Sequence, residues 1–310
     1  MIYRLLRTIV LLISYIPFPV GQFLGRILGT AVSVVPMIRT GVVLENIQQS
    51  FDGLMGKGEA KKLLRRVFMH FGQMVFEVPH VLRLSPVNLD KYVIIDGEEN
   101  LRDAIKKGRG AFVLTGHFGN WELMSGAVAL RFGNAAVVAR PFDFKPLDRL
   151  MLDLRSRFDT EVVYKHRAMR RLVQLVKEKK MVGILLDQNV DWYEGAFVNF
   201  LGRRACTNKG LALMALRFGT PVVPVFSLRQ KDGRYRIVIE REVNLIITGD
   251  RTRDIEENTA LFTAIIEAYV RKYPDHWFWF HRRWKTRPYC PLPEDFYSSS
   301  PSPSRQEAVA

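Results

Sequence analysis

Between residues 92 and 272, short runs of β-branched and apolar residues alternate with amphipathic runs, and this alternation restricts the fold more than any other feature. Residues 111–115 (AFVLT) and 135–139 (AAVVA) are typical apolar runs, and residues 121–132 between them have helical spacing. Strands that alternate with helices imply a largely parallel sheet covered on both faces. The predicted fold class is α/β: a mixed, largely parallel central sheet flanked by helices.

The same alternation sets the bounds of the expected elements. The predicted strands are 92–95, 111–115, 135–139, 161–164, 181–186, 222–228 and 234–240, and the predicted helices are 98–107, 121–132, 146–158, 169–179, 209–218 and 254–272. Residues 40–90 also have helical spacing, and Pro79 should end or kink the second helix there. The QKDG sequence at 230–233 is typical of a hairpin turn, so the last two strands should be antiparallel.

The N-terminus is unusually apolar. Residues 8–25 carry no charge but are interrupted by Pro17 and Pro19, and a second apolar run covers 27–38. Because a spanning helix needs about 20 apolar residues, the length is borderline. We expect a helical membrane anchor or interfacial hairpin, with buried core helices and a signal peptide as alternatives.

Three regions follow from these patterns. The anchoring segment is assigned to 1–39, the α/β domain to 40–295 and a Ser/Pro-rich disordered tail to 296–310. The net charge of +15 indicates attraction to a polyanion, which could be nucleic acid, anionic lipid or an acidic protein. Cys206 and Cys290 lie far apart and no metal-ligand spacing is present, so neither a disulfide framework nor a zinc site is expected.

A histidine leaves the apolar run 111–115 through Gly116, in the sequence HFGNWE at 117–122. An imidazole is a useful general base near neutral pH, and a carboxylate on its second nitrogen would fix the tautomer. Glu122 is the candidate partner of His117, with Gly119 letting the chain fold back. The alternative is a capping histidine beside a solvated glutamate.

Other polar residues follow predicted strands. Arg140 follows one strand, and Asp187 and Gln188 follow another. Since α/β sites gather at the carboxyl ends of strands, we expect Arg140 near His117 if their two strands are neighbours. Arg140 would bind a phosphate or support an oxyanion. A surface arginine and a capping aspartate are the alternatives.

Two further stretches are basic. Arg203 and Lys209 lie in a predicted basic loop before a helix, a plausible phosphate cradle, and Arg229 ends another strand. Residues 277–285 interleave three tryptophans with basic residues, a composition that can stack nucleobases, sit among lipid headgroups or form a structural strap. We expect inward-packed tryptophans at 277 and 279, and Arg282 or Arg283 near anionic headgroups.

Residues 115–122 (TGHFGNWE) resemble the signature of the bacterial lipid A late acyltransferases, the lauroyl and myristoyl transferases of the lysophospholipid acyltransferase superfamily. Three more stretches agree in order: DQN at 187–189 with FVNFLG at 197–202, GTPVVPVF at 219–226 with Arg229, and WFWFHRRWK at 277–285. Leu201 departs from the phenylalanine that the family more often has, at a position expected to serve packing. The resemblance extends from the N-terminal apolar segment to about Pro291.

The resemblance implies a metal-independent, cofactor-free O-acyltransferase of the bacterial inner membrane, with its catalytic domain on the cytoplasmic side. Its partners would be an acyl-acyl carrier protein, a lipid A precursor and the anionic membrane surface, without nucleic acid. His117 would take the proton of an acceptor hydroxyl, and Glu122 would orient His117. Substrate binding or oxyanion support would fall to Arg140, Asp187, Gln188, Arg203, Lys209, Arg229, Arg282 and Arg283.

Two alternatives stay open from the sequence. The same chemistry could act on another lipid acceptor, such as a phosphatidylinositol mannoside, a lysophospholipid or a lipoamino acid. A basic protein that binds nucleic acid or membranes without catalysis is an alternative of a different class. The apolar N-terminus and the lack of a nucleic-acid-binding motif argue against nucleic acid.

Overall fold

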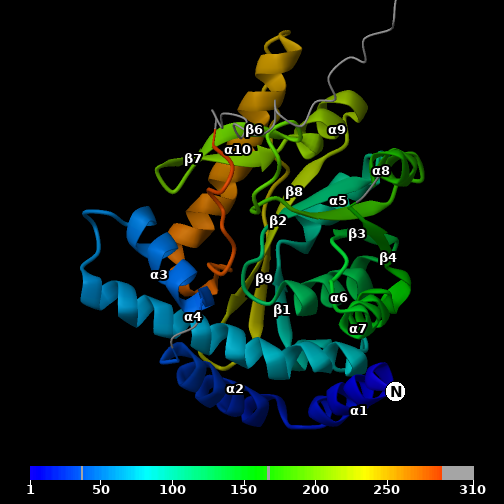
Figure 1. The fold of residues 1–310 in the computed structure, drawn as a ribbon. Coiled ribbons are helices and arrows are strands. Elements are labelled where there is room, and N and C mark those ends of the chain that lie inside the picture. Colours follow the sequence, from blue (N-terminus) through cyan, green and yellow to red (C-terminus); the bar gives the residue numbers. More distant parts are fainter. Residues whose placement is uncertain (36–37, 166–167, 288–310) are drawn as a thin grey trace, which may run out of the picture.

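The computed structural model describes residues 1–35, 38–165 and 168–287 (Figure 1). A seven-stranded sheet has the strand order β1-β9-β8-β2-β5-β3-β4. Its strands are β1 (Val93–Asp96), β2 (Ala111–Thr115), β3 (Ala135–Ala139), β4 (Glu161–Tyr164), β5 (Met181–Leu185), β8 (Val222–Arg229) and β9 (Tyr235–Ile239). All neighbours are parallel except β8 and β9, which are antiparallel. The predicted largely parallel sheet with an antiparallel last pair is confirmed.

Side chains of β2 alternate between two cores on opposite faces of the sheet. Phe112 and Leu114 belong to one core, and Ala111 and Val113 belong to the other. The first core is covered by α8 (Ala168–Lys177), α9 (Gly210–Phe218) and α10 (Arg251–Lys272), and the second by α5 (Glu98–Lys106), α6 (Trp121–Phe132) and α7 (Lys145–Arg155). Both faces of the sheet are therefore buried, as the continuous apolar strands require.

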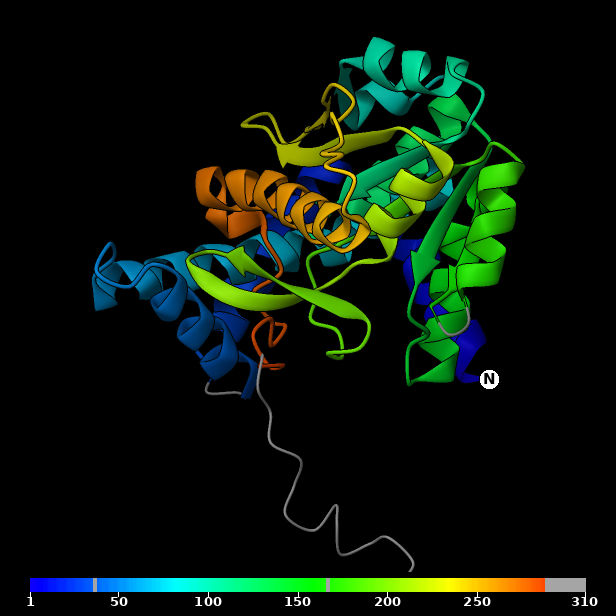
Figure 2. The same cartoon turned by 90° about the horizontal axis from the view of Figure 1, so that it is seen from above.

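Residues 195–208, which the sequence analysis treated as a loop, form a separate antiparallel hairpin. Strand β6 (Gly195–Phe200) pairs with β7 (Arg203–Asn208), and the hairpin lies beside α10 (Figure 2). Its turn uses Leu201 and Gly202, both with positive φ. The alternating burial of Ala196, Val198 and Phe200 is a strand pattern that the neighbouring basic residues obscured.

An N-terminal helical hairpin lies along α4 (Lys57–Glu77) (Figure 1). It consists of α1 (Ile2–Ser14) and α2 (Phe18–Ser33), which are bent 118° relative to one another. Glycines allow the close contact, because a Cβ on Gly25 would lie 2.4 Å from the Cα of Gln73 and a Cβ on Gly29 would lie 2.1 Å from the carbonyl oxygen of Phe68. The N-terminal segment is thus packed on the rest of the protein.

The outer face of this hairpin is apolar. Exposed side chains on α1 and α2 include Ile2, Leu5, Ile9, Leu11, Leu12, Val20, Phe23, Leu24, Ile27 and Leu28. Within the described ranges, no single helix is long and apolar enough to cross a membrane, and α1 and α2 meet the length and composition criteria only as a bent pair.

The remaining elements are helical. They are α3 (Ile38–Ser50) and the 3-10 turns η1 (Val78–Arg83), η2 (Leu89–Lys91), η3 (Arg157–Asp159) and η4 (Pro274–His276). Helix α4 ends at Glu77, two residues before Pro79, so the predicted helix stop is confirmed. The predicted tail at 296–310 lies outside the described residues.

Candidate active site

His117 and Asp187 meet at the carboxyl edge of the sheet. Strands β2 and β5 are parallel neighbours, with Thr115 opposite Leu185, so the residues after each strand lie side by side. The intervening Gly116 leaves room for the carboxylate, because a Cβ there would lie 3.1 Å from Cγ of Asp187. This register places Asp187 and Gln188, which the sequence puts at the end of a strand, beside His117.

Three donors converge on the Asp187 carboxylate, which is almost fully buried. The Nδ1 atom of His117 lies 2.8 Å from Oδ1, the His117 backbone N–H donates to Oδ2 at 2.9 Å, and Trp277 Nε1 donates to Oδ2 at 2.7 Å. Burial alone would raise the pKa of Asp187, but the charge and hydrogen bonds of His117 and the Trp277 hydrogen bond lower it to about 2. Asp187 is therefore a carboxylate at neutral pH.

An ionised carboxylate can only accept hydrogen bonds, so Nδ1 of His117 carries a proton, and in the neutral imidazole Nε2 is then the basic nitrogen. The side-chain amide of Gln188 lies 3.2 Å from Nε2, in position to donate to it. The His117 side chain is 22% exposed, whereas that of Asp187 is 2% exposed. The arrangement has the parts of a general base: a basic nitrogen on a partly exposed ring, from which a reactant hydroxyl would displace the Gln188 amide, and a buried carboxylate behind the ring.

The C-terminal strap, which consists of residues 277–285 and the preceding His276, holds the turn that carries His117. Phe118 forms a β-bridge with Trp277, and Phe278 N–H donates to the carbonyl oxygen of His117 at 3.0 Å. The Gly119 N–H donates to the carbonyl oxygen of His276 at 2.9 Å. Gly119 has φ +59° and a Cβ there would lie 1.8 Å from the carbonyl oxygen of Ser227, so only glycine fits.

Glu122 does not contact His117 as the sequence analysis expected. It lies in the first turn of α6 and forms an ion pair with Arg155 at the end of α7, with Arg155 Nε 3.0 Å from Oε2. Trp121 Nε1 also donates to Oε1 of Glu122 at 3.0 Å. Asn120 caps α6, which directs the first helical turn toward α7, so Asp187 occupies the position assigned to Glu122.

Sequence reasoning missed Arg155, whose only sequence signal is a place in an amphipathic helix. Its side chain is 17% exposed and that of Glu122 is 10% exposed, so the pair is largely shielded from water. Burial would lower the pKa of Arg155, but Glu122 outweighs burial and raises it. The opposite charges of Glu122 and Arg155 thus lie within one helical turn of the cap of α6. Each is the counterion that the other needs in this poorly hydrated position.

Arg140 does not lie beside His117. Strand β5 separates β2 from β3 in the sheet, so the strand-neighbour condition for Arg140 fails. Its side chain is 81% exposed, and the charged partner found for it in the described part of the chain is Asp143, at 4.0 Å. Arg140 therefore lies on the surface at the same edge of the sheet, two strands from the one that leads to His117.

Two predicted substrate-binding arginines are buried in structural contacts. Arg229 pairs with the fully buried Glu77 and lies over the Tyr235 ring. Arg283 is fully buried and donates to the carbonyl oxygen of Cys206 at 2.8 Å, and burial lowers its pKa to about 10. Of the two residues expected near headgroups, Arg282 or Arg283, Arg283 does not fit that role, because its guanidinium faces the β6–β7 hairpin.

The other basic residues remain closer to the surface. Arg282 is exposed, Arg203 stacks on the Trp284 ring at 4.3 Å, and Lys209 is the N-cap residue of α9. The predicted inward packing of Trp277 and Trp279 is confirmed, since they are 1% and 0% exposed.

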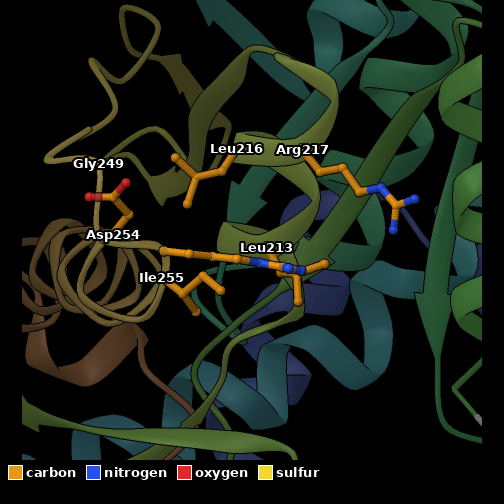
Figure 3. A pocket seen from close by; sticks show the side chains of 7 residues that line it. Leu213, Leu216, Arg217, Gly249, Asp254 and Ile255 are labelled. Carbon is orange, nitrogen blue, oxygen red and sulfur yellow. The ribbon is translucent and has the colours of Figure 1, made fainter.

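Cys206 is fully buried, and burial raises the pKa of its thiol, so this side chain serves packing. A separate pocket lies between α9 and the start of α10, lined by Leu213, Leu216, Arg217, Gly249, Arg251, Asp254 and Ile255 (Figure 3). Helix α9 leads into β8, and the start of β8 pairs with the start of β2. This pocket therefore lies at the sheet edge opposite His117.

Within the ranges that the structure describes, no group of three or more potential metal ligands was found.

Comparison with known proteins covers nearly the whole chain. Residues 2–286 match the family described as bacterial lipid A biosynthesis acyltransferase. The chain is 24% identical over 275 residues to the lipid A biosynthesis palmitoleoyltransferase of Escherichia coli strain K12, covering 88% of this chain and 87% of that protein. It is 24% identical over 279 residues to the lauroyltransferase of the same strain, covering 89% of each.

One solved structure, the 1-acyl-sn-glycerophosphate acyltransferase of Thermotoga maritima, aligns with 89% of this chain and 99% of its own, at 16% identity and a TM-score of 0.39. The family match itself includes the N-terminal hairpin, the whole central sheet and the strap around His117.

Proposed function

Because the chain belongs to the bacterial lipid A biosynthesis acyltransferase family, we propose that it transfers a fatty acyl chain from an acyl-acyl carrier protein to a hydroxyl of a lipid A precursor. The observation that carries this proposal is the His117–Asp187 pair, which makes Nε2 the basic nitrogen of the neutral imidazole on a side chain that is 22% exposed. The relatives are named as transferases of palmitoleoyl and lauroyl chains in lipid A biosynthesis, which supports the acceptor class.

The proposed reaction needs no acyl-enzyme. Nε2 of His117 takes the proton of the acceptor hydroxyl while its oxygen attacks the thioester carbonyl. Asp187 holds the proton on Nδ1 and stabilises the imidazolium that forms. When the tetrahedral intermediate collapses, the C–S bond breaks and the proton on Nε2 passes to the departing thiolate. The products are an ester on the lipid and the free thiol of the carrier protein.

Negative charge builds on the thioester oxygen during the attack, and a fixed donor there would lower the barrier. The Gln188 side-chain amide is the proposed donor, since it lies 3.2 Å from Nε2 of His117 and therefore beside the reacting atoms. The Glu122–Arg155 pair is proposed to fix the first turn of α6. The surface cations Arg140, Arg203, Lys209 and Arg282 remain proposed contacts for substrate phosphates or the acidic carrier protein.

We also propose that the enzyme works on the cytoplasmic face of the bacterial inner membrane. The exposed apolar side chains of α1 and α2 form a face suited to the headgroup–acyl boundary. The net charge of +15 favours binding to anionic lipid. The hairpin thus lies on the membrane, where its lipid acceptor is found.

The test is to incubate purified protein with a range of acyl-acyl carrier proteins and a tetra-acylated lipid A precursor bearing Kdo sugars. The mass of the lipid is followed, with a folded His117→Ala protein as control. A mass gain of one acyl chain, lost in the variant, supports the proposal and identifies the chain length. No gain with any donor from folded protein moves the assignment to another lipid acceptor, and wild-type turnover by His117→Ala refutes the proposed base.

A further inference from the structure

A buried carboxylate joins the N-terminal hairpin to the turn that carries His117. Glu77 is the last residue of α4, and its side chain is 0% exposed. It accepts hydrogen bonds from Gln22 at 2.8 Å, Asn120 at 3.1 Å and the Tyr235 hydroxyl at 2.8 Å, and it pairs with Arg229. These donors come from four different elements, so Glu77 ties α2, the cap of α6, β8 and β9 together.

Gln22 connects this carboxylate to the hairpin. Its side chain is buried, although α2 presents an apolar face to the outside. One amide hydrogen bond goes to Glu77 and the other to the carbonyl oxygen of Gly233, at 2.7 Å. Gly233 has φ +88° and a Cβ there would lie 2.4 Å from Oε1 of Gln22, so the β8–β9 turn is shaped around this side chain. Gln22 is thus a specific contact and not general packing.

Asn120 connects the carboxylate to the catalytic turn. Its Oδ1 accepts from the Leu123 N–H at 3.0 Å and so caps α6, while its Nδ2 donates to Glu77. Glu77 therefore decides which side of the Asn120 amide faces the helix. If the amide turned over, an NH₂ group would face the Leu123 N–H and the cap would be lost. Asn120 lies only three residues after His117, so the first turn of α6 and the His117 turn would shift together.

We propose that Glu77 is a positioning residue for His117, and that Gln22 is the contact through which the N-terminal hairpin supports the catalytic turn. Neither residue touches the reacting atoms. The inference rests on the proposed acyltransferase function for its kinetic readout. The membrane-facing hairpin must therefore be docked correctly for His117 to be placed correctly.

The test compares Gln22→Met, which keeps the side-chain length and removes both donors, with Ser33→Ala. Ser33 is also buried on α2, but among the described residues its hydroxyl donates within its own helix, to the carbonyl oxygen of Thr30. A displacement of reacting groups by a fraction of an ångström lowers turnover sharply, so we expect Gln22→Met to reduce kcat by about ten-fold or more with KM changed less than about two-fold. Ser33→Ala should match the wild type in both constants.

A second readout does not depend on activity. The ring-nitrogen NMR shifts of His117, assigned with the His117→Ala protein, report its tautomer and surroundings. We expect them to move in Gln22→Met and further in Glu77→Gln, and to stay in place in Ser33→Ala. Glu77→Gln leaves Arg229 without its counterion and can lose its fold, in which case Gln22→Met decides.

The outcomes separate the two ideas. If wild-type protein transfers no acyl chain but the His117 shifts respond to Gln22→Met, the proposed function fails and the positioning role stands. If folded Gln22→Met keeps wild-type kcat and unchanged His117 shifts, the positioning role is overturned while the acyltransferase function stands. A change in KM alone, with kcat and the shifts unaltered, also overturns it.

Discussion

The Nδ1 atom of His117 lies 2.8 Å from Oδ1 of Asp187, although the two residues are 70 positions apart in the chain. The contact depends on the pairing of β2 with β5, and Trp277 from the C-terminal strap completes the shell of the carboxylate. Three distant segments therefore build the surroundings of the His117 ring.

Asp187→Asn should lower kcat by about 100-fold or more, because an asparagine amide can donate to Nδ1 and so place the imidazole proton on Nε2. KM should change little, since Asp187 is buried behind the ring. Steady-state transfer assays measure both constants. Asp191→Asn, an exposed aspartate in the same loop, is the matched control. Turnover of Asp187→Asn at the wild-type rate would remove Asp187 from the mechanism.

Glu122→Gln should reduce both stability and turnover while leaving the His117 tautomer unchanged. The substitution strands the largely buried Arg155 charge, and breaking such a pair costs about 3 kcal/mol of unfolding free energy. Urea unfolding of Glu122→Gln, Arg155→Gln and the double variant should show that the two losses are far from additive. The competing idea, that Glu122 orients His117, requires the ring-nitrogen shifts of His117 to change in Glu122→Gln as they do in Asp187→Asn.

Trp277→Phe should lower kcat by about ten-fold, because it removes the donor 2.7 Å from Oδ2 of Asp187 and keeps most of the ring volume. Trp279→Phe provides a close control. That indole is equally buried but donates to the carbonyl oxygen of Pro274 and not to Asp187. Equal losses of kcat in the two proteins would mean that packing, not the hydrogen bond, is responsible.

Lowering the pH should reduce the free energy of unfolding, because it protonates the Asp187 carboxylate. Its pKa is lowered from the ordinary 3.8 to about 2 in the folded protein, so its stabilising effect is complete above about pH 4 and is lost as pH falls toward 2. The expected contribution to the unfolding free energy is roughly 2 kcal/mol. Urea midpoints measured from pH 6 downward should therefore fall more steeply for the wild type than for Asp187→Asn. Parallel curves would contradict the lowered pKa.

Replacing Phe23 and Ile27 together by serine should weaken binding to vesicles of anionic phospholipid by at least about ten-fold. These side chains are 62% and 53% exposed on α2, so the fold should be unaffected. Sedimentation with vesicles measures the loss. Val87→Ser, at a side chain that is 94% exposed outside the hairpin, should bind like the wild type. Undiminished binding of the double variant would show that another surface meets the membrane.

Local patterns in the sequence were sufficient to predict most strands of the central sheet. The strands 111–115, 135–139 and 161–164 and the helix 121–132 have the predicted bounds, because turn residues flank a clear apolar period on each side. The β6–β7 hairpin was missed, since the alternation of burial in β6 is short and β7 begins with the basic pair Arg203 and Arg204, which favoured a loop. Its identity as a hairpin depends on packing against α10, which no local period reveals.

The candidate site was predictable only in part. Gly116 and a histidine after a buried strand pointed to His117, which the structure places against a buried carboxylate, but the nearest carboxylate in sequence was not its partner in space. Strand order decides that partner, and the order β2-β5-β3 brings Asp187 close while keeping Arg140 away. Burial of Arg283 likewise depends on where the strap crosses the hairpin, which is a property of the tertiary fold.

The glycine contact between α2 and α4 has a practical consequence for preparing the protein. Removing residues 1–33 to avoid detergent would strip α4 of the surface that Gly25 and Gly29 cover and would delete the Gln22 contact to Glu77. Such a shortened chain would lose the apolar outer face of the hairpin but would expose the apolar surface of α4 that the hairpin covers. A detergent-free form is better sought by replacing the outward side chains of the hairpin and leaving its backbone in place.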